Sequence, residues 1–296
     1  MTAVLQPPRA VGLPDGAVLL VLGGWAALFG PVYWEALDTL WKTEDQGHGP
    51  LVLVVCAWLF WQQKDRLAAL PDRHQHLAGW PLLLVGLLGF LLGRTLSLPF
   101  LVFGAQLPIA AGVLLLLKGS AGIRVAWFAL LFLLFMTPLP GTLVDSSTHV
   151  LKQWISVIIT ELLHALGYPV SRTGVTISVG PYQLLVADAC SGMHSMFSLT
   201  ALGTLYMYIV RRSNRLHNAI MLAIILPTAF FANIVRVMIL VLVTFYFGEE
   251  AGSGFLHGFA GMALLVVSLA VLFGVDALLL RLLPSRRPAA AEGTAA

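Results

Sequence analysis

Long apolar runs separated by short polar segments dominate the chain, and eight of these runs are typical of membrane-spanning helices. A hydrocarbon core about 30 Å thick requires roughly 20 helical residues. The predicted spans are 17–34, 49–62, 77–93, 98–117, 122–139, 190–210, 217–247 and 255–280. The pattern therefore predicts an all-α polytopic membrane protein with about eight transmembrane helices.

The sequence shows no internal repeat and no linker, so we expect a single membrane-embedded domain over residues 17–282. Residues 1–16 contain prolines before the first apolar run and are expected to form a cytoplasmic N-terminal segment, not a cleaved signal peptide. Residues 283–296 are expected to be a disordered cytoplasmic tail, with no further soluble domain after the last span.

Residues 140–189 do not fit a simple span. Within "DSSTHVLKQWISVIITELLHALG" polar and apolar side chains take opposite faces of an amphipathic helix, which either lies in the membrane interface or lines a polar cavity. The polar face is His149, Gln153, Ser156, Thr160 and His164, and the apolar face is Leu151, Trp154, Ile155, Ile158 and Leu162. The following "GVTISVGPYQLLV" alternates around Gly180-Pro181, which predicts a small β-hairpin. Because sheet-like backbone is tolerated only outside the hydrocarbon or inside protein, we expect the helix and hairpin to form an extracytoplasmic cap.

Composition and charge support a membrane protein and suggest its orientation. The chain is 58% hydrophobic and 10% charged, whereas soluble domains carry about 25% charged residues. The basic residues fall between apolar runs, so they indicate orientation and not a nucleic-acid partner. With the N- and C-termini in the cytoplasm, the cytoplasmic side holds most of the basic residues: Arg9, Lys64, Arg66, Arg73, Lys118, Arg124, Arg211, Arg212, Arg215, Arg281, Arg286 and Arg287.

Three reactive residues are expected at one depth on the outer side. Cys190, in "LLVADACSGMHSMFSLTALG", opens its span from outside. Arg236 follows Leu216, near the inner start of the next span, by twenty residues, or about 30 Å of helix. His257 lies in the first turn of the last span. The spacing thus allows Cys190, Arg236 and His257 to meet.

These residue types suit acyl transfer. A helix N-terminus and a nearby cation favour the thiolate form of a cysteine. A histidine can take the thiol proton and return it to a leaving amine, and an arginine can stabilise the oxyanion of the transition state. We therefore predict a cysteine acyl-transfer centre, with no metal and no cofactor.

Each residue also has a structural interpretation. Cys190 could be a small packing residue, as we expect for Cys56. Arg236 could snorkel to the headgroups, and His257 could be an interfacial loop residue. His194 could tune the thiol or bind a neighbouring helix. Two further residues are assigned structural roles: Asn233 holding Arg236, and Asp276 pairing with Arg281.

Three stretches resemble the signature regions of the exosortase/archaeosortase family: "ACSGMHS" at 189–195, "NIVRV" at 233–237 and "LHGFAGM" at 256–262. The resemblance covers about residues 40–280, and the wording around the cysteine is similar to the exosortase B subclass. It implies a cysteine protease or transpeptidase that cleaves C-terminal PEP-CTERM sorting signals of exported proteins. The implied catalytic residues are Cys190 as nucleophile, Arg236 as transition-state stabiliser and His257 as acid/base, supported by Asp188, Ser191, Gly192, His194 and Asn233.

The sequence departs from the family pattern at Asp188, where many members have Glu, and at His194, where many have Arg or Asn. The resemblance implies a bacterial inner-membrane location with the active site outside. The implied partners are the sorting-signal helix, the lipid bilayer and an unknown acceptor. Lys152 or Arg172 is a candidate partner for the glutamate of the sorting motif. A multi-span transporter and a non-catalytic membrane component of polysaccharide or protein export are the alternatives.

Overall fold

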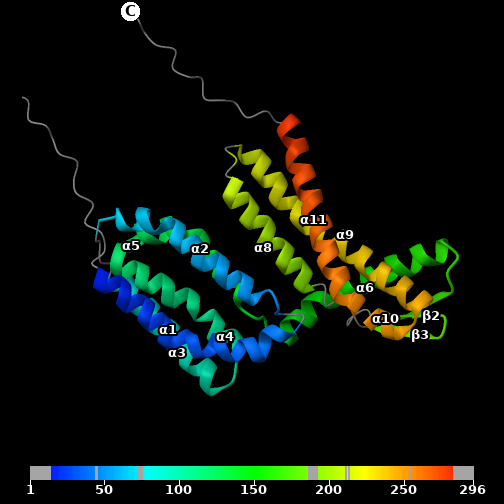
Figure 1. The fold of residues 1–296 in the computed structure, drawn as a ribbon, viewed down its shortest axis with the longest axis horizontal. Coiled ribbons are helices and arrows are strands. Elements are labelled where there is room, and N and C mark those ends of the chain that lie inside the picture. The colour runs from blue at the N-terminus through cyan, green and yellow to red at the C-terminus, as the bar shows by residue number, and fades with distance from the viewer. Residues whose placement is uncertain are drawn as a thin grey trace, which may run out of the picture. The chain divides into compact units, whose positions relative to one another are not determined.

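The computed structural model describes residues 15–43, 46–71, 76–185, 193–210, 212, 214–253 and 255–282. At residues 15, 76, 141–148, 185, 193–196, 253 and 255–265 it describes the backbone alone. The chain forms two compact units, Met1–Gly141 and Thr142–Ala296, here called the N-terminal and C-terminal units. Helices make up most of both units, as predicted (Figure 1).

The N-terminal unit is helical throughout its described elements. These are α1 (Asp15–Asp38), η1 (Leu40–Lys42), α2 (Gly49–Ala68), α3 (His76–Thr95), α4 (Pro99–Gly104), α5 (Gln106–Leu133) and η2 (Leu134–Met136). Three glycines of α3 sit where its neighbours approach closely. A Cβ on Gly79, Gly86 or Gly93 would overlap a side chain or backbone atom of α4 or α5. Small residues allow this close helix packing in membrane proteins.

The fourth and fifth predicted spans are joined through a break at Gly119. This glycine has φ 65° and ψ −160° inside α5, a backbone conformation that residues with a Cβ rarely adopt. The preceding Lys118 is buried, and its Nζ donates to the carbonyl oxygen of Leu70 at 2.9 Å, just beyond the end of α2. The ammonium group thus meets carbonyl oxygen where a helix ends.

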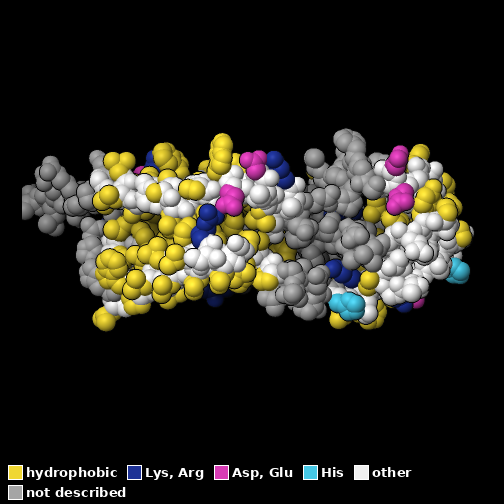
Figure 2. Space-filling view, turned by 90° about the horizontal axis from the view of Figure 1, so that it is seen from below, with side chains coloured by type: hydrophobic (Ala, Val, Ile, Leu, Met, Phe, Trp, Pro, Cys, Tyr) yellow, Lys and Arg dark blue, Asp and Glu magenta, His cyan; other side chains and the backbone are white. Residues whose placement is uncertain are grey.

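Apolar side chains cover much of the surface, as a lipid environment requires. Figure 2 shows them over the N-terminal unit. Leu20 of α1 and Leu88 of α3 are among the exposed leucines of this unit. Among the described residues four stretches are long and apolar enough to cross a membrane: Gly16–Asp38, Leu77–Thr95, Pro99–Met136 and Arg215–Phe247. Phe197–Val210 is a shorter apolar helix. The chain is a multi-pass membrane protein, and eight crossings stay a prediction.

The C-terminal unit combines helices with one small sheet. Its elements are α6 (Gly141–Ala165), β1 (Val170–Thr173), β2 (Thr176–Val179), β3 (Tyr182–Leu185), α8 (Met193–Val210), α9 (Arg215–Phe247), α10 (Glu249–Ser253) and α11 (Phe255–Leu282). The sheet is antiparallel in the order β1-β2-β3, with Val170 opposite Val179 and Val179 opposite Tyr182. The predicted hairpin at Gly180 is confirmed as β2–β3, and β1 adds a strand that was not predicted.

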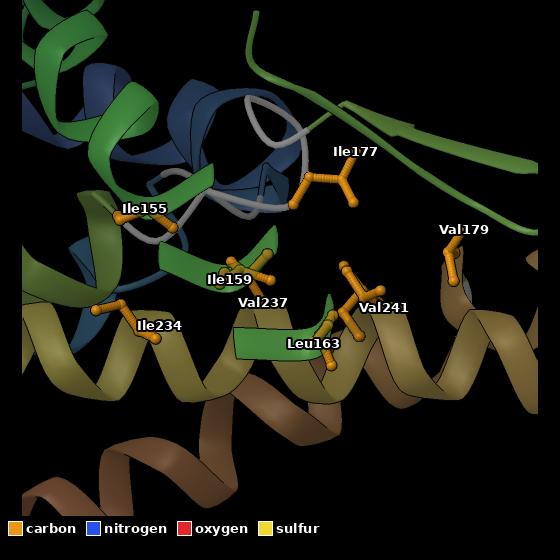
Figure 3. Close-up of a cluster of buried hydrophobic side chains, with 9 residues drawn as sticks. Ile155, Ile159, Leu163, Ile177, Val179, Ile234, Val237 and Val241 are labelled. Carbon is orange, nitrogen blue, oxygen red and sulfur yellow. The ribbon is translucent and has the colours of Figure 1, made fainter. Parts of the chain in front are cut away.

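One face of α6 packs on the sheet and on α9 (Figure 3). Ile155, Ile159 and Leu163 are buried in one cluster with residues of β2 and α9. The packed side of α6 takes members of both predicted faces. Ile155 of the apolar face and Ser156 of the polar face are buried, whereas Trp154 of the apolar face is 60% exposed. Ser156 can be buried because its hydroxyl donates to the Gln153 and Gly174 carbonyl oxygens, at 2.8 and 3.3 Å.

Candidate active site

The structure describes the predicted site residues to different extents. Asp188, Cys190, Ser191 and Gly192 lie outside the described residues. His194 and His257 lie on the described backbone of α8 and α11, without a described side chain. Four residues are described in full: Lys152, Arg172, Asn233 and Arg236.

Arg236 is a buried cation on a membrane helix. It is 6% exposed, and Asn233, about one turn earlier on α9, is 4% exposed. Both residues take part in interactions within the protein. A snorkelling arginine would expose its guanidinium, so the burial of Arg236 argues against that interpretation. A charge inside a membrane helix is costly and is usually functional.

The next turn of α9 supports the cap. Val237 and Val241 are buried in one cluster with Ile177 of β2 (Figure 3). Leu184 of β3 packs on the same cluster. The sheet is therefore anchored to α9 immediately beyond Arg236. From Leu185 at the end of β3, the chain reaches Cys190 in five residues.

A polar contact between His217 and Asp276 sets the register of α9 against α11. The two helices pack together and run antiparallel through α10, and His217 Nε2 lies 2.6 Å from Asp276 Oδ1. Arg236 follows His217 by 19 residues, and position 257 precedes Asp276 by 19 residues. At about 1.5 Å per residue, both positions lie about 28 Å along the helices from that contact. The backbone thus brings Arg236 and position 257 to similar levels.

The α9–α10 turn agrees with this register. Gly248 has φ 87° after the end of α9, and α10 then folds back along that helix. A Cβ on Gly252 would overlap Oγ1 of Thr244, whose hydroxyl donates to the Leu240 carbonyl oxygen at 2.9 Å. The chain has therefore returned alongside α9 before α11 begins at Phe255.

Asp276 accepts from three side chains. His217 contacts Oδ1, and Oδ2 accepts from Tyr206 Oη and from the guanidinium of Arg212, each at 2.8 Å. The predicted partner Arg281 is exposed and does not take part in this cluster, so that prediction was wrong. Five helical residues turn a side chain by about 140°, which points Arg281 away from the buried face. The sequence did contain a signal for the His217–Asp276 pair, which was missed. His217 precedes Arg236 by 19 residues, and Asp276 follows position 257 by the same number.

Arg172 lies in the β1–β2 hairpin, which contacts α6 one helical turn beyond Lys152. The guanidinium of Arg172 donates to the carbonyl oxygen of Gly174 at 2.7 Å, and Ser156 of α6 donates to the same oxygen. Lys152 lies one helical turn before Ser156. The turn between β1 and β2 therefore rests on the part of α6 that carries Lys152. Among the described side chains, no three His, Cys, Asp or Glu groups are placed to hold a metal ion.

These features define a polytopic membrane protein with a buried arginine beside a small cap. The model of the transmembrane exosortase family matches residues 40–274. The chain belongs to that family, and the exosortase B subclass stays a prediction. Exosortases are membrane transpeptidases for sorting signals, generally of the cysteine type. No curated protein and no solved structure is significantly similar to the chain.

Proposed function

We propose that this exosortase cleaves C-terminal PEP-CTERM sorting signals of exported proteins by acyl transfer through a thioester on Cys190. The observation that carries the proposal is the buried guanidinium of Arg236, on a helix whose register levels it with position 257. A buried cation at that level is the group that an acyl-transfer transition state needs. The family match and the order of the three signature stretches support the same assignment.

The reaction begins when His257 takes the proton of the Cys190 thiol. The thiolate attacks the carbonyl carbon of the scissile peptide, and Arg236 stabilises the oxyanion that forms. His257 then gives its proton to the leaving amine, the C–N bond breaks, and a thioester remains on Cys190. Water or an acceptor amine resolves the thioester, yielding a free carboxylate or a new amide and restoring the thiol.

The remaining site residues have supporting roles in this proposal. Asn233 shares the buried face of α9 with Arg236 and orients its guanidinium. Asp188, Ser191, Gly192 and His194 flank the nucleophile, where backbone N–H groups at a helix start favour a thiolate.

Substrate recognition is assigned to the cap. Lys152 and Arg172, on α6 and β1, provide positive charge for the glutamate of the sorting motif. The active site faces the periplasm of a bacterial inner membrane, and both termini lie in the cytoplasm. The substrate helix lies in the bilayer against the spans, with its motif just above the membrane.

Co-expression with a tagged Pro-Glu-Pro, helix and basic-tail substrate tests the proposal. Substrate size on a gel is compared for wild type, Cys190→Ala and the control Cys56→Ala, which changes a cysteine buried in α2. We expect Cys190→Ala to abolish cleavage at normal membrane levels and Cys56→Ala to retain it. Equal cleavage by all three proteins would show that Cys190 is not the nucleophile. The transporter and scaffold alternatives would then be favoured.

A further inference from the structure

The Asp276 carboxylate joins helices whose opposite ends lead to the proposed catalytic residues. Its donors are Tyr206 on α8, Arg212 in the α8–α9 turn and His217 on α9, while Asp276 itself lies on α11. Asp276 and His217 are 4% and 2% exposed. One buried side chain thus connects all three helices of this bundle.

The surrounding turn is built to hold this arrangement. Asn214 caps α9 by accepting from the backbone N–H groups of Leu216 and His217. Asn218 Nδ2 donates to the carbonyl oxygen of Arg212 at 2.9 Å. The backbone at Arg212 and Asn214 is therefore tied to the first turn of α9, and Arg212 donates to the Asp276 carboxylate from this position. A buried carboxylate is tolerated when several donors replace its hydration.

The axial register of α9 and α11 determines where the proposed catalytic groups lie relative to one another. Arg236 and position 257 are level only while His217 stays opposite Asp276. A slip of α11 by one residue would shift position 257 by about 1.5 Å along α9. Misplacement of about 1 Å by a change far from the reacting atoms can lower a rate by about 100-fold. Apolar packing alone specifies axial position less sharply than a directed polar contact.

We propose that Asp276, His217, Tyr206 and Arg212 form a positioning clamp that sets α8, α9 and α11 in the register required for acyl transfer. The clamp rests on the proposed function, because its purpose is to align the catalytic residues. None of the four side chains touches the substrate. They act through the helices, so they are positioning residues.

Processing kinetics with the sorting-signal substrate are the first test. Asp276→Asn keeps the side-chain shape but cannot satisfy three donors, so we expect kcat to fall about 10- to 100-fold with KM nearly unchanged. Asp276→Glu should restore part of kcat. Ser268→Ala, a change at another buried polar position of α11, is the matched control and should leave kcat unchanged. An unchanged kcat in Asp276→Asn would overturn the clamp.

Helix register is measured independently of activity. Spin labels at Ile239 of α9 and Val266 of α11, both exposed, report the inter-helix distance when Cys56 and Cys190 are changed to Ala. We expect Asp276→Asn to shift or broaden the distance distribution and Ser268→Ala to preserve it. If Asp276→Asn does not accumulate, Tyr206→Phe removes a single hydroxyl and takes its place. An unchanged distribution would overturn the clamp. A register shift in Asp276→Asn, found together with no cleavage of the sorting-signal substrate by the wild-type enzyme, would overturn the proposed function and not the clamp.

Discussion

His217 Nε2 on α9 lies 2.6 Å from Asp276 Oδ1 on α11. Each of these residues is 19 residues from a proposed catalytic position on its own helix. Because antiparallel helices rise by the same amount per residue, this contact levels Arg236 with position 257. At the other end of α9, Gly252 of α10 lies close to Thr244 just before α11 begins. The two contacts bracket the proposed site, so the active-site geometry depends on residues distant from the chemistry.

Enlarging Gly252 should disturb the site from the α9–α10 turn. A methyl group at this position has to displace Thr244, whose hydroxyl is buried and bonded to Leu240. We expect Gly252→Ala to lower kcat for the sorting-signal substrate and to destabilise the fold by about 1–3 kcal/mol. Gly274→Ala on α11 meets open space and is the control. Equal kcat and melting temperature in the two variants would contradict this register.

Replacing Arg236 should remove transition-state stabilisation. We expect Arg236→Gln to lower kcat by about 100- to 1,000-fold with a small effect on KM, the usual cost of losing one oxyanion donor. Arg236→Lys should recover little, because an ammonium group cannot reproduce the planar guanidinium in a buried site. Arg215→Gln, at the exposed start of α9, is the control. Normal kcat in Arg236→Gln at wild-type membrane levels would exclude the assigned role.

Reversing charges should test recognition by the cap. Arg172→Glu should raise KM for a substrate whose motif carries glutamate, because like charges repel across the contact. A substrate with lysine in place of that glutamate should restore binding to the variant and weaken binding to wild type. Cleavage rates of the four enzyme–substrate combinations provide the measurement. If the two changes act independently, Arg172 does not contact the motif glutamate.

The stability of the N-terminal unit should depend on pH through His48. Its Nε2 lies 3.1 Å from the carbonyl oxygen of Phe135, and burial lowers the pKa of His48 below its ordinary value of 6.5. Below pH 6.5 the unfolded chain therefore binds a proton at His48 more readily than the folded chain does. The folded state accordingly loses stability as the pH falls. We expect the melting temperature in detergent to fall from pH 7.5 to pH 5.5, and to fall less in His48→Gln. Identical pH dependence in both proteins would show that His48 is not responsible.

The helices and the hairpin were predictable because their signals are local. Apolar length marked the membrane helices, and Gly180 marked the turn between β2 and β3, where it has φ 55°. The strand β1 escaped prediction because its sequence, "VSRT", has no apolar alternation. The burial of Ser156, on the predicted polar face of α6, was not predictable because it depends on carbonyl acceptors at Gln153 and Gly174.

The polar network was harder to predict because it depends on tertiary contacts. Spacing indicated a shared level for Arg236 and His257, but the pairing of Asp276 was assigned to Arg281, its neighbour in sequence. The actual partners come from α8, α9 and the turn between them. A short sequence separation is a weak guide when the side chains point to different sides of a helix.

The most direct test of the account is mass spectrometry of the enzyme isolated from cells that express the sorting-signal substrate. The account predicts a peptide containing Cys190 that carries the N-terminal fragment of the cleaved substrate and loses it in neutral hydroxylamine, as a thioester does. The adduct should be absent from Cys190→Ala and present in Cys56→Ala. Substrate carried on another residue, or cleavage that continues in Cys190→Ala, would contradict acyl transfer through Cys190.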